Sequence, residues 1–209
     1  MQSETQIERN TFERNNNINS IMSVFPLAHE WSVWYYEDRT TNYPKTPSEY
    51  RDHLRLVGNF NSVPSFWGMY EALPSITNLR QSAVYHYHWS GAIPLREDPV
   101  HSNGGGLIIR APETSAVTIW ETLCMGLVGG TIDVHLDRTL GILGVSIKKR
   151  NVLQRIYQVD CWLKNKKDLY KMEAFVEKHL HDQEILEIYF SDHKDHCAFN
   201  EKKLRKAGK

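Results

Sequence analysis

The chain has 209 residues, with 25 Lys and Arg against 25 Asp and Glu, so its formal net charge is +0. This balance excludes a protein coated with basic residues for general polyanion binding, but it is compatible with a local basic site. Hydrophobic residues make up 41% of the chain, and no stretch approaches the ~20 apolar residues of a membrane helix. We expect a disordered arm over residues 1–24, a single domain over residues 25–200 and a basic tail over residues 201–209, with no membrane partner.

The cysteines indicate a reducing compartment. Cys124, Cys161 and Cys197 are far apart and form no CxxC pair. The polar residues 1–19 contain no apolar segment of the kind found in secretory signals. Both features predict a protein of the cytosol, or also of the nucleus, with reduced thiols.

The first third of the domain predicts strands and one helix. Residues 30–36 are β-branched and aromatic and predict a strand, residues 39–48 a loop, and the alternation over residues 53–57 a second strand. Ser62 as N-cap and Pro64 in the first turn predict a helix start. The apolar face of this helix carries Val63, Phe66, Trp67 and Tyr70.

The remainder alternates strand and helix signals. We expect strands over residues 83–89, 107–109, 140–147, 152–162 and 185–190. Further helices are expected from Pro112 to Gly129 and over residues 167–180, with turns at residues 104–106 and 148–151. Because hairpin-like pairs of strands dominate, the pattern predicts an α+β fold of an antiparallel sheet with helices on one face.

Two kinds of site are considered for the ring-containing residues. The 6 Trp and 10 Tyr fit either a large core or a stacking site for a flat ligand. His86 and His88 lie two apart on one face of a strand, and a small metal-dependent enzyme would use them. A zinc site needs three or four converging ligands, so we interpret the histidines as ordinary surface and core residues and expect no cofactor.

A nucleotide-sized site is the remaining interpretation. Aromatic residues in or beside loops, an acidic pair with a neighbouring arginine, and a basic cluster around one hairpin supply its parts. A carboxylate can accept two hydrogen bonds from a guanine edge, rings can cover the faces of the base, and Lys or Arg can hold phosphates. The residues are Tyr43, Tyr50, Trp89, Arg96, Glu97, Asp98, Lys148, Lys149, Arg150 and Arg155.

The order of motifs resembles the messenger-RNA cap-binding translation initiation factor 4E family over roughly residues 25–190. An opening strand, two helices, a cap loop and a late strand end occur in the family's order. The matching segments are Phe25 to Leu27 with Trp31 to Tyr36, Leu54 to Val57 with Val63 to Tyr70, Gly91 to Asp98, Trp120 to Gly129, and Trp162 to Asn165.

This resemblance implies a curved antiparallel sheet of about eight strands, backed by three helices on its convex face, and a protein that is not an enzyme. It also implies a slot for 7-methylguanosine. Glu97 matches the residue that reads the base edge, Trp162 the one that touches the methyl group, and Lys148 the first phosphate ligand. Arg155 or Gln158 falls near the second phosphate ligand.

The chain departs from the family at both stacking tryptophans. Tyr50 or Tyr43 falls at the first, depending on the alignment, and Arg96 replaces the second. We hypothesise that Trp89 or a loop tyrosine supplies a ring, and that Arg96 faces phosphates or a neighbouring nucleotide. A methylated base is cationic, so it gains a cation–π attraction over Tyr or Trp.

The resemblance also implies a partner surface on the convex face. Trp67, Val63 and Pro26 match positions that bind peptides of scaffold or binding proteins. Thr122 replaces the family's acidic residue there, so the choice of partner is expected to be altered. The sequence therefore predicts a protein that binds the 5′ cap of mRNA in translation initiation; the alternative is a homologue with weak or lost cap binding that acts as a translational repressor.

Overall fold

The computed structural model describes residues 25–37, 46–81 and 83–195. The expected arm, the expected basic tail, Tyr43 and Cys197 lie outside these ranges. The described residues form one sheet of seven antiparallel strands, in the order β2-β1-β3-β5-β6-β4-β7. The α+β class is confirmed, with seven strands in the described part where about eight were expected. The strands are β1 (Pro26–Glu37), β2 (Leu54–Ser62), β3 (Ala83–Trp89), β4 (Gly105–Pro112), β5 (Ile142–Asn151), β6 (Ile156–Leu163) and β7 (Glu187–Asp192).

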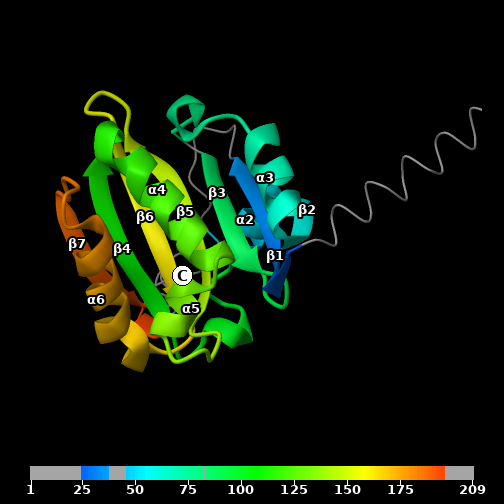
Figure 1. Cartoon of the computed structure of the whole chain (residues 1–209). Coiled ribbons are helices and arrows are strands. Elements are labelled where there is room, and N and C mark those ends of the chain that lie inside the picture. Colours follow the sequence, from blue (N-terminus) through cyan, green and yellow to red (C-terminus); the bar gives the residue numbers. More distant parts are fainter. Residues whose placement is uncertain (1–24, 38–45, 82, 196–209) are drawn as a thin grey trace, which may run out of the picture.

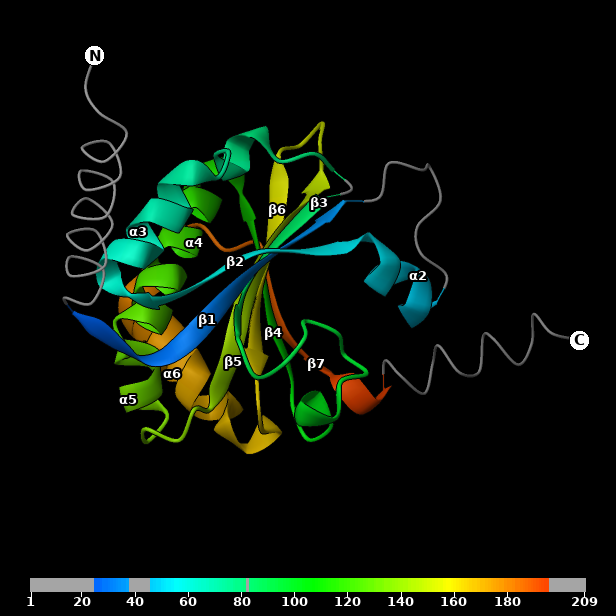
Figure 2. The same cartoon turned by 90° about the vertical axis from the view of Figure 1, so that its right-hand side faces the viewer.

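Three longer helices cover one face of the sheet, as expected, with the short α5 beside them (Figures 1 and 2). Their apolar sides and the facing strand residues form the main core, which includes Phe66, Trp120 and Phe175. The helices are α2 (Pro47–His53), α3 (Val63–Ala72), α4 (Glu113–Val128), α5 (Thr131–His135) and α6 (Leu169–Leu180). None of the helices in the described ranges has the length and apolar character to cross a bilayer.

The start of α3 follows the sequence closely. Ser62 is its N-cap and accepts a hydrogen bond from the backbone N–H of Ser65, and a proline occupies the first turn. The Ser65 hydroxyl accepts a hydrogen bond in return from the Ser62 backbone N–H. These bonds satisfy N–H groups that have no partner within the helix, so the local sequence fixes where α3 begins.

Three local predictions were wrong. A loop was expected to end at residue 48 and a strand to begin at residue 53, but residues 47–53 form helix α2, which Thr46 caps through its hydroxyl. Gly105 and Gly106 lie inside β4, because the missing side chain at Gly105 makes room for the Phe190 ring. The turn between β5 and β6 falls at residues 152–155, so the basic residues 148–151 belong to β5.

Side chains that alternate with the core residues point to the other face of the sheet, which we call the opposite face. Helix α2 and the connection between β3 and β4 lie on this side in Figure 2. Cross-strand pairing aligns His86, Ser146 and Asp160 in one row of the opposite face, and Lys148, Gln158 and Arg110 in the next. Trp162 pairs with Gly144 one row further along. The register therefore gathers polar side chains from four strands on one surface.

Candidate functional site

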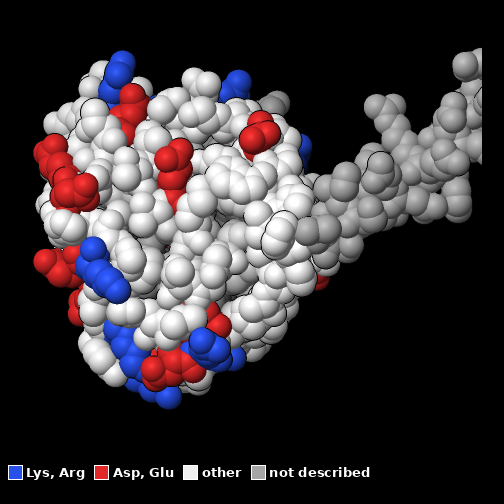
Figure 3. Space-filling view, in the orientation of Figure 1, with Lys and Arg blue, Asp and Glu red and all other residues white. Residues whose placement is uncertain are grey.

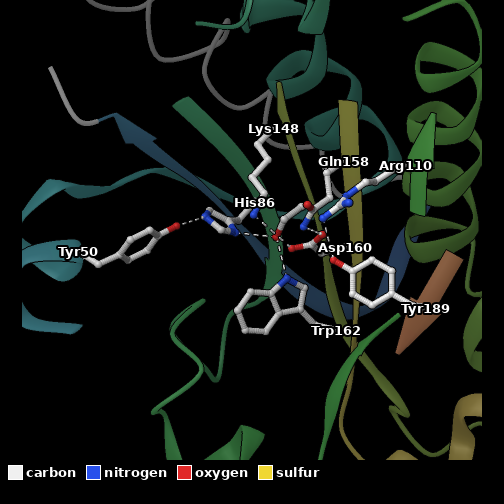
Figure 4. Close-up of polar contacts among 9 residues, drawn as sticks. Tyr50, His86, Arg110, Lys148, Gln158, Asp160, Trp162 and Tyr189 are labelled. Carbon is white, nitrogen blue, oxygen red and sulfur yellow. Dashed lines mark hydrogen bonds and ion pairs between the residues drawn. The ribbon is translucent and has the colours of Figure 1, made fainter. Parts of the chain in front are cut away.

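A chain of hydrogen bonds crosses the opposite face from α2 to β6 (Figure 4). The Tyr50 hydroxyl bonds to His86 Nε2 at 2.9 Å, and His86 Nδ1 bonds to the Ser146 hydroxyl at 2.6 Å. Trp162 Nε1 donates to the same hydroxyl at 2.8 Å. Burial lowers the pKa of His86 to about 3, with Lys148 adding to the effect. His86 is therefore neutral at physiological pH, and its two hydrogen bonds link Tyr50 of α2 to Ser146 of β5.

Trp162 is surrounded by histidine rings. The ring centroids of His101 and His193 each lie 5.1 Å from its indole, and that of His88 lies 5.4 Å away. All three histidines are buried, and Trp162 itself is 5% exposed. Sequence reasoning found Trp162 but not this cluster, because His101 and His193 come from segments that are distant in the chain.

The protonation of the His88–His101 pair follows from its partners. His101 Nδ1 faces the Leu95 carbonyl oxygen and must donate to it, so the Nε2 of neutral His101 accepts. His88 Nε2, 3.0 Å away, therefore carries the proton and donates. Burial lowers the pKa of His88 and of His101. The pair is a neutral structural link between β3 and the β3–β4 connection.

The metal-dependent alternative has little support in this geometry. Both ring nitrogens of His86 already have hydrogen-bond partners, and His88 Nε2 is bonded to another histidine. Among the described residues, no group of three or more His, Cys, Asp or Glu side chains is placed to hold a metal ion.

The β3–β4 connection carries the expected Arg96 and Glu97. Asp98 accepts hydrogen bonds from the backbone N–H groups of Ile93 and Val100 and so fixes the shape of this connection. Glu97 is exposed and Arg96 is partly buried. After burial, the Arg96 charge is the next cause that lowers the pKa of His193, to about 4.

Of the expected phosphate ligands, Lys148 lies on the opposite face and Arg155 does not join it. The Lys148 side chain is 29% exposed and its Nζ lies 3.9 Å from Asp160. Arg155 lies in the exposed turn, with its guanidinium 3.3 Å from Glu113 at the start of α4. Gln158, the other candidate, points to the opposite face and donates to Asp160.

Two of the rings that were expected to stack on the base, those of Tyr50 and Trp89, pack against other residues of the protein. Tyr50 stacks on Tyr36 with a centroid distance of 4.1 Å and an interplanar angle of 7°, so one of its faces is covered. Trp89 packs against the core on the helix-covered face, with Gly91 against its ring. The hypothesis that Trp89 supplies a ring to the site is therefore not supported, because strand alternation turns it away from Trp162.

The three expected partner-binding residues lie together. Val63 and Trp67 on α3 are 36% and 37% exposed, and the Val63 N–H bonds to the Phe25 carbonyl beside Pro26. Met125 on α4 is 40% exposed. In Figure 3 the surface over α3 and α4 is largely uncharged, with isolated acidic side chains. We call Pro26, Val63, Trp67 and Met125 the apolar helical surface.

Sequence reasoning missed Ser146 and Asp160. Each lies two residues from a residue that was singled out, Ser146 from Lys148 and Asp160 from Trp162. Since residues two apart in a strand share a face, polar residues at this spacing were a usable signal. Which of the two faces would be buried under helices was not visible in the sequence.

Comparisons with known proteins agree with this architecture. The family model for eukaryotic initiation factor 4E matches residues 26–207. A wheat (Triticum aestivum) protein named eukaryotic translation initiation factor NCBP is 28% identical over 179 residues, covering 84% of this chain and 71% of the relative. A solved complex of C. elegans eIF4E-3 with the 4E-binding protein Mextli and a cap analog has a TM-score of 0.70 at 22% identity, covering 83% of this chain and 95% of that one. A schistosome eIF4E complexed with m7GpppG and 4E-BP has a TM-score of 0.69 at 21% identity, covering 82% and 90%. The family match spans most of the chain and the solved structures share its fold, so the chain belongs to the eukaryotic initiation factor 4E family.

Proposed function

We propose that this protein binds the 7-methylguanosine cap of mRNA on its opposite face and recruits a partner protein of translation initiation through its apolar helical surface. Membership of the family supports this function. So do the names of the similar structures, which describe complexes with a cap analog or m7GpppG and with 4E-binding proteins. The activity is binding rather than catalysis.

The observation that carries the proposal is that Trp162 and Lys148 project from the same face of the sheet (Figure 4). The β3–β4 connection, which contains Arg96 and Glu97, lies on this side of the sheet (Figure 2). Burial lowers the pKa of His101 and the charges of Asp98 and Glu97 oppose this, and the His101 ring centroid lies 5.1 Å from that of Trp162. A ring, a carboxylate and a basic side chain are the groups that a cationic base with a phosphate chain requires. We place the function in the cytosol or nucleus, which fits the unpaired, buried Cys124 and Cys161.

Titration of the tryptophan fluorescence with 7-methyl-GTP and with GTP tests this function. We expect quenching by 7-methyl-GTP at concentrations at least about tenfold lower than by GTP, because only the methylated base is cationic. An equal, weak response to both nucleotides would favour the alternative of a repressor without cap binding, which the 5% exposure of Trp162 makes worth testing.

Glu97→Ala provides the matched variant. If Glu97 accepts two hydrogen bonds from the base edge, its loss should lower the affinity for 7-methyl-GTP by about 100-fold. The thermal stability should not change, since Glu97 is exposed. Unaltered affinity would show that another residue reads the base.

A further inference from the structure

Asp160 is a buried carboxylate at the centre of the opposite face. The register places it on β6 between Gln158 and Trp162 and opposite Ser146 of β5. Its side chain is only 9% exposed. Gln158 Nε2 donates to one carboxylate oxygen at 2.7 Å, and Lys148 Nζ lies 3.9 Å from the other.

The second carboxylate oxygen of Asp160, Oδ2, can still accept hydrogen bonds or contact a positively charged ligand. A distance of 3.9 Å is too long for a hydrogen bond, so Lys148 attracts Oδ2 only as a charge. A carboxylate accepts about four hydrogen bonds, and nearly buried carboxylates usually fill most of them. Asp160 is therefore a nearly buried carboxylate that accepts fewer hydrogen bonds than its two oxygens allow.

Hydrogen bonds lead from Tyr50 of α2 through His86 to Ser146, which lies opposite Asp160. Burial raises the pKa of Tyr50, Asp160 raises it further and Arg96 opposes the rise. Tyr50 therefore lies within range of both charges. An acidic group on the sheet and a basic group on the β3–β4 connection therefore both act on Tyr50 of α2.

Basic groups continue from Asp160 across the sheet. Lys148, Gln158 and Arg110 lie side by side on β5, β6 and β4. Arg110 donates to the Tyr189 hydroxyl at 3.1 Å and forms an ion pair with Glu187 of β7, while its buried Nε has no hydrogen-bond partner among the described residues. Burial lowers the pKa of Lys148 in spite of Asp160, so Asp160 compensates its charge only in part.

We propose that Asp160 binds the positive charge of the methylated base, with the base against Trp162 and the phosphate chain directed over Lys148 and Arg110. This inference rests on the proposed function and adds to it a residue that selects the charge of the ligand. A methylated nucleotide is zwitterionic, with a cationic base and anionic phosphates. The opposite face carries the complementary arrangement, an acid beside a ring and bases in the adjoining row (Figure 4). Complementarity of this kind fixes the orientation of a ligand as well as its affinity.

Asp160→Asn tests the proposal, since Asn keeps the shape and can still accept from Gln158. The affinities for 7-methyl-GTP and GTP are measured by fluorescence titration on the full chain. We expect the affinity for 7-methyl-GTP to fall by about tenfold, as for a charge pair in a partly solvated site, while that for GTP stays equal or rises. The preference for the methylated nucleotide should therefore collapse.

Two further variants separate the alternatives. Lys148→Met should weaken GTP at least as much as 7-methyl-GTP, because it removes a phosphate ligand from both nucleotides and leaves the Asp160 charge uncompensated for the cationic base. Asp182→Asn, an exposed acid after α6, should change neither affinity. If Asp160→Asn melts early, Asp160→Ser, which also accepts a hydrogen bond, takes its place. A folded Asp160 variant that keeps the wild-type ratio overturns the inference. A wild-type protein with no preference for 7-methyl-GTP overturns the proposed function itself.

Discussion

Ser146 joins the two halves of the hydrogen-bond chain on the opposite face, so its removal has a defined cost. In Ser146→Ala, His86 Nδ1 and the Trp162 N–H lose bonds of 2.6 and 2.8 Å in a buried site. Each buried polar group left without a partner costs about 1–3 kcal/mol. Two such groups lower the free energy of unfolding by about 2–6 kcal/mol. For a protein of this size, the melting temperature should fall by at least about 4 °C.

Thermal denaturation followed by circular dichroism measures this effect. Tyr50→Phe removes only the outer bond of the chain and should cost about 1 kcal/mol. Ser102→Ala, at an exposed serine of the β3–β4 connection, is the control and should melt like the wild type. A shift below about 2 °C for Ser146→Ala would refute the reasoning, because it would mean that Ser146 does not satisfy the two ring nitrogens.

Two predictions concern the helical surface and the buried histidines. Trp67→Ala should weaken binding of a 4E-binding-protein peptide by at least about 30-fold, as loss of a central aromatic anchor does, and should not change binding of 7-methyl-GTP. A pull-down measures peptide binding and a fluorescence titration measures nucleotide binding. An equal loss of both would show that Trp67 is a core residue. The folded-state pKa values of His86 and His193, about 3 and about 4, lie below the ordinary 6.5, so the unfolded state binds more protons in acid. The contribution of these neutral histidines to the free energy of unfolding is therefore complete above about pH 6.5, and below that pH it decreases by about 1.4 kcal/mol per pH unit for each histidine. Urea unfolding at about pH 7 and about pH 5 should show this fall, and His86→Gln should reduce it; identical midpoints at both pH values would contradict the assignment of buried neutral rings.

The local sequence determined much of the fold, because its signals act over a few residues. Ser62 and Pro64 fix the start of α3, and Gly129 and Gly130 lie at the end of α4, as the sequence predicted. Alternation in β3 correctly put His86 and His88 on one face. The order of motifs indicated the family, because it extends over most of the chain and depends on no single contact.

Tertiary structure alone decided how the site is assembled. Strand alternation shows which neighbours share a side of the sheet with Trp89 and with Trp162. Only the packing of α3, α4 and α6 decides which side of the sheet is covered by helices, and as a result Trp89 packs against the core while Trp162 lies on the opposite face. Register across β3, β5 and β6 brings Ser146 and Asp160 beside His86 and Trp162. Such pairings join residues far apart in the chain, and no local periodicity encodes them, since a shift of one residue would turn every side chain to the other face.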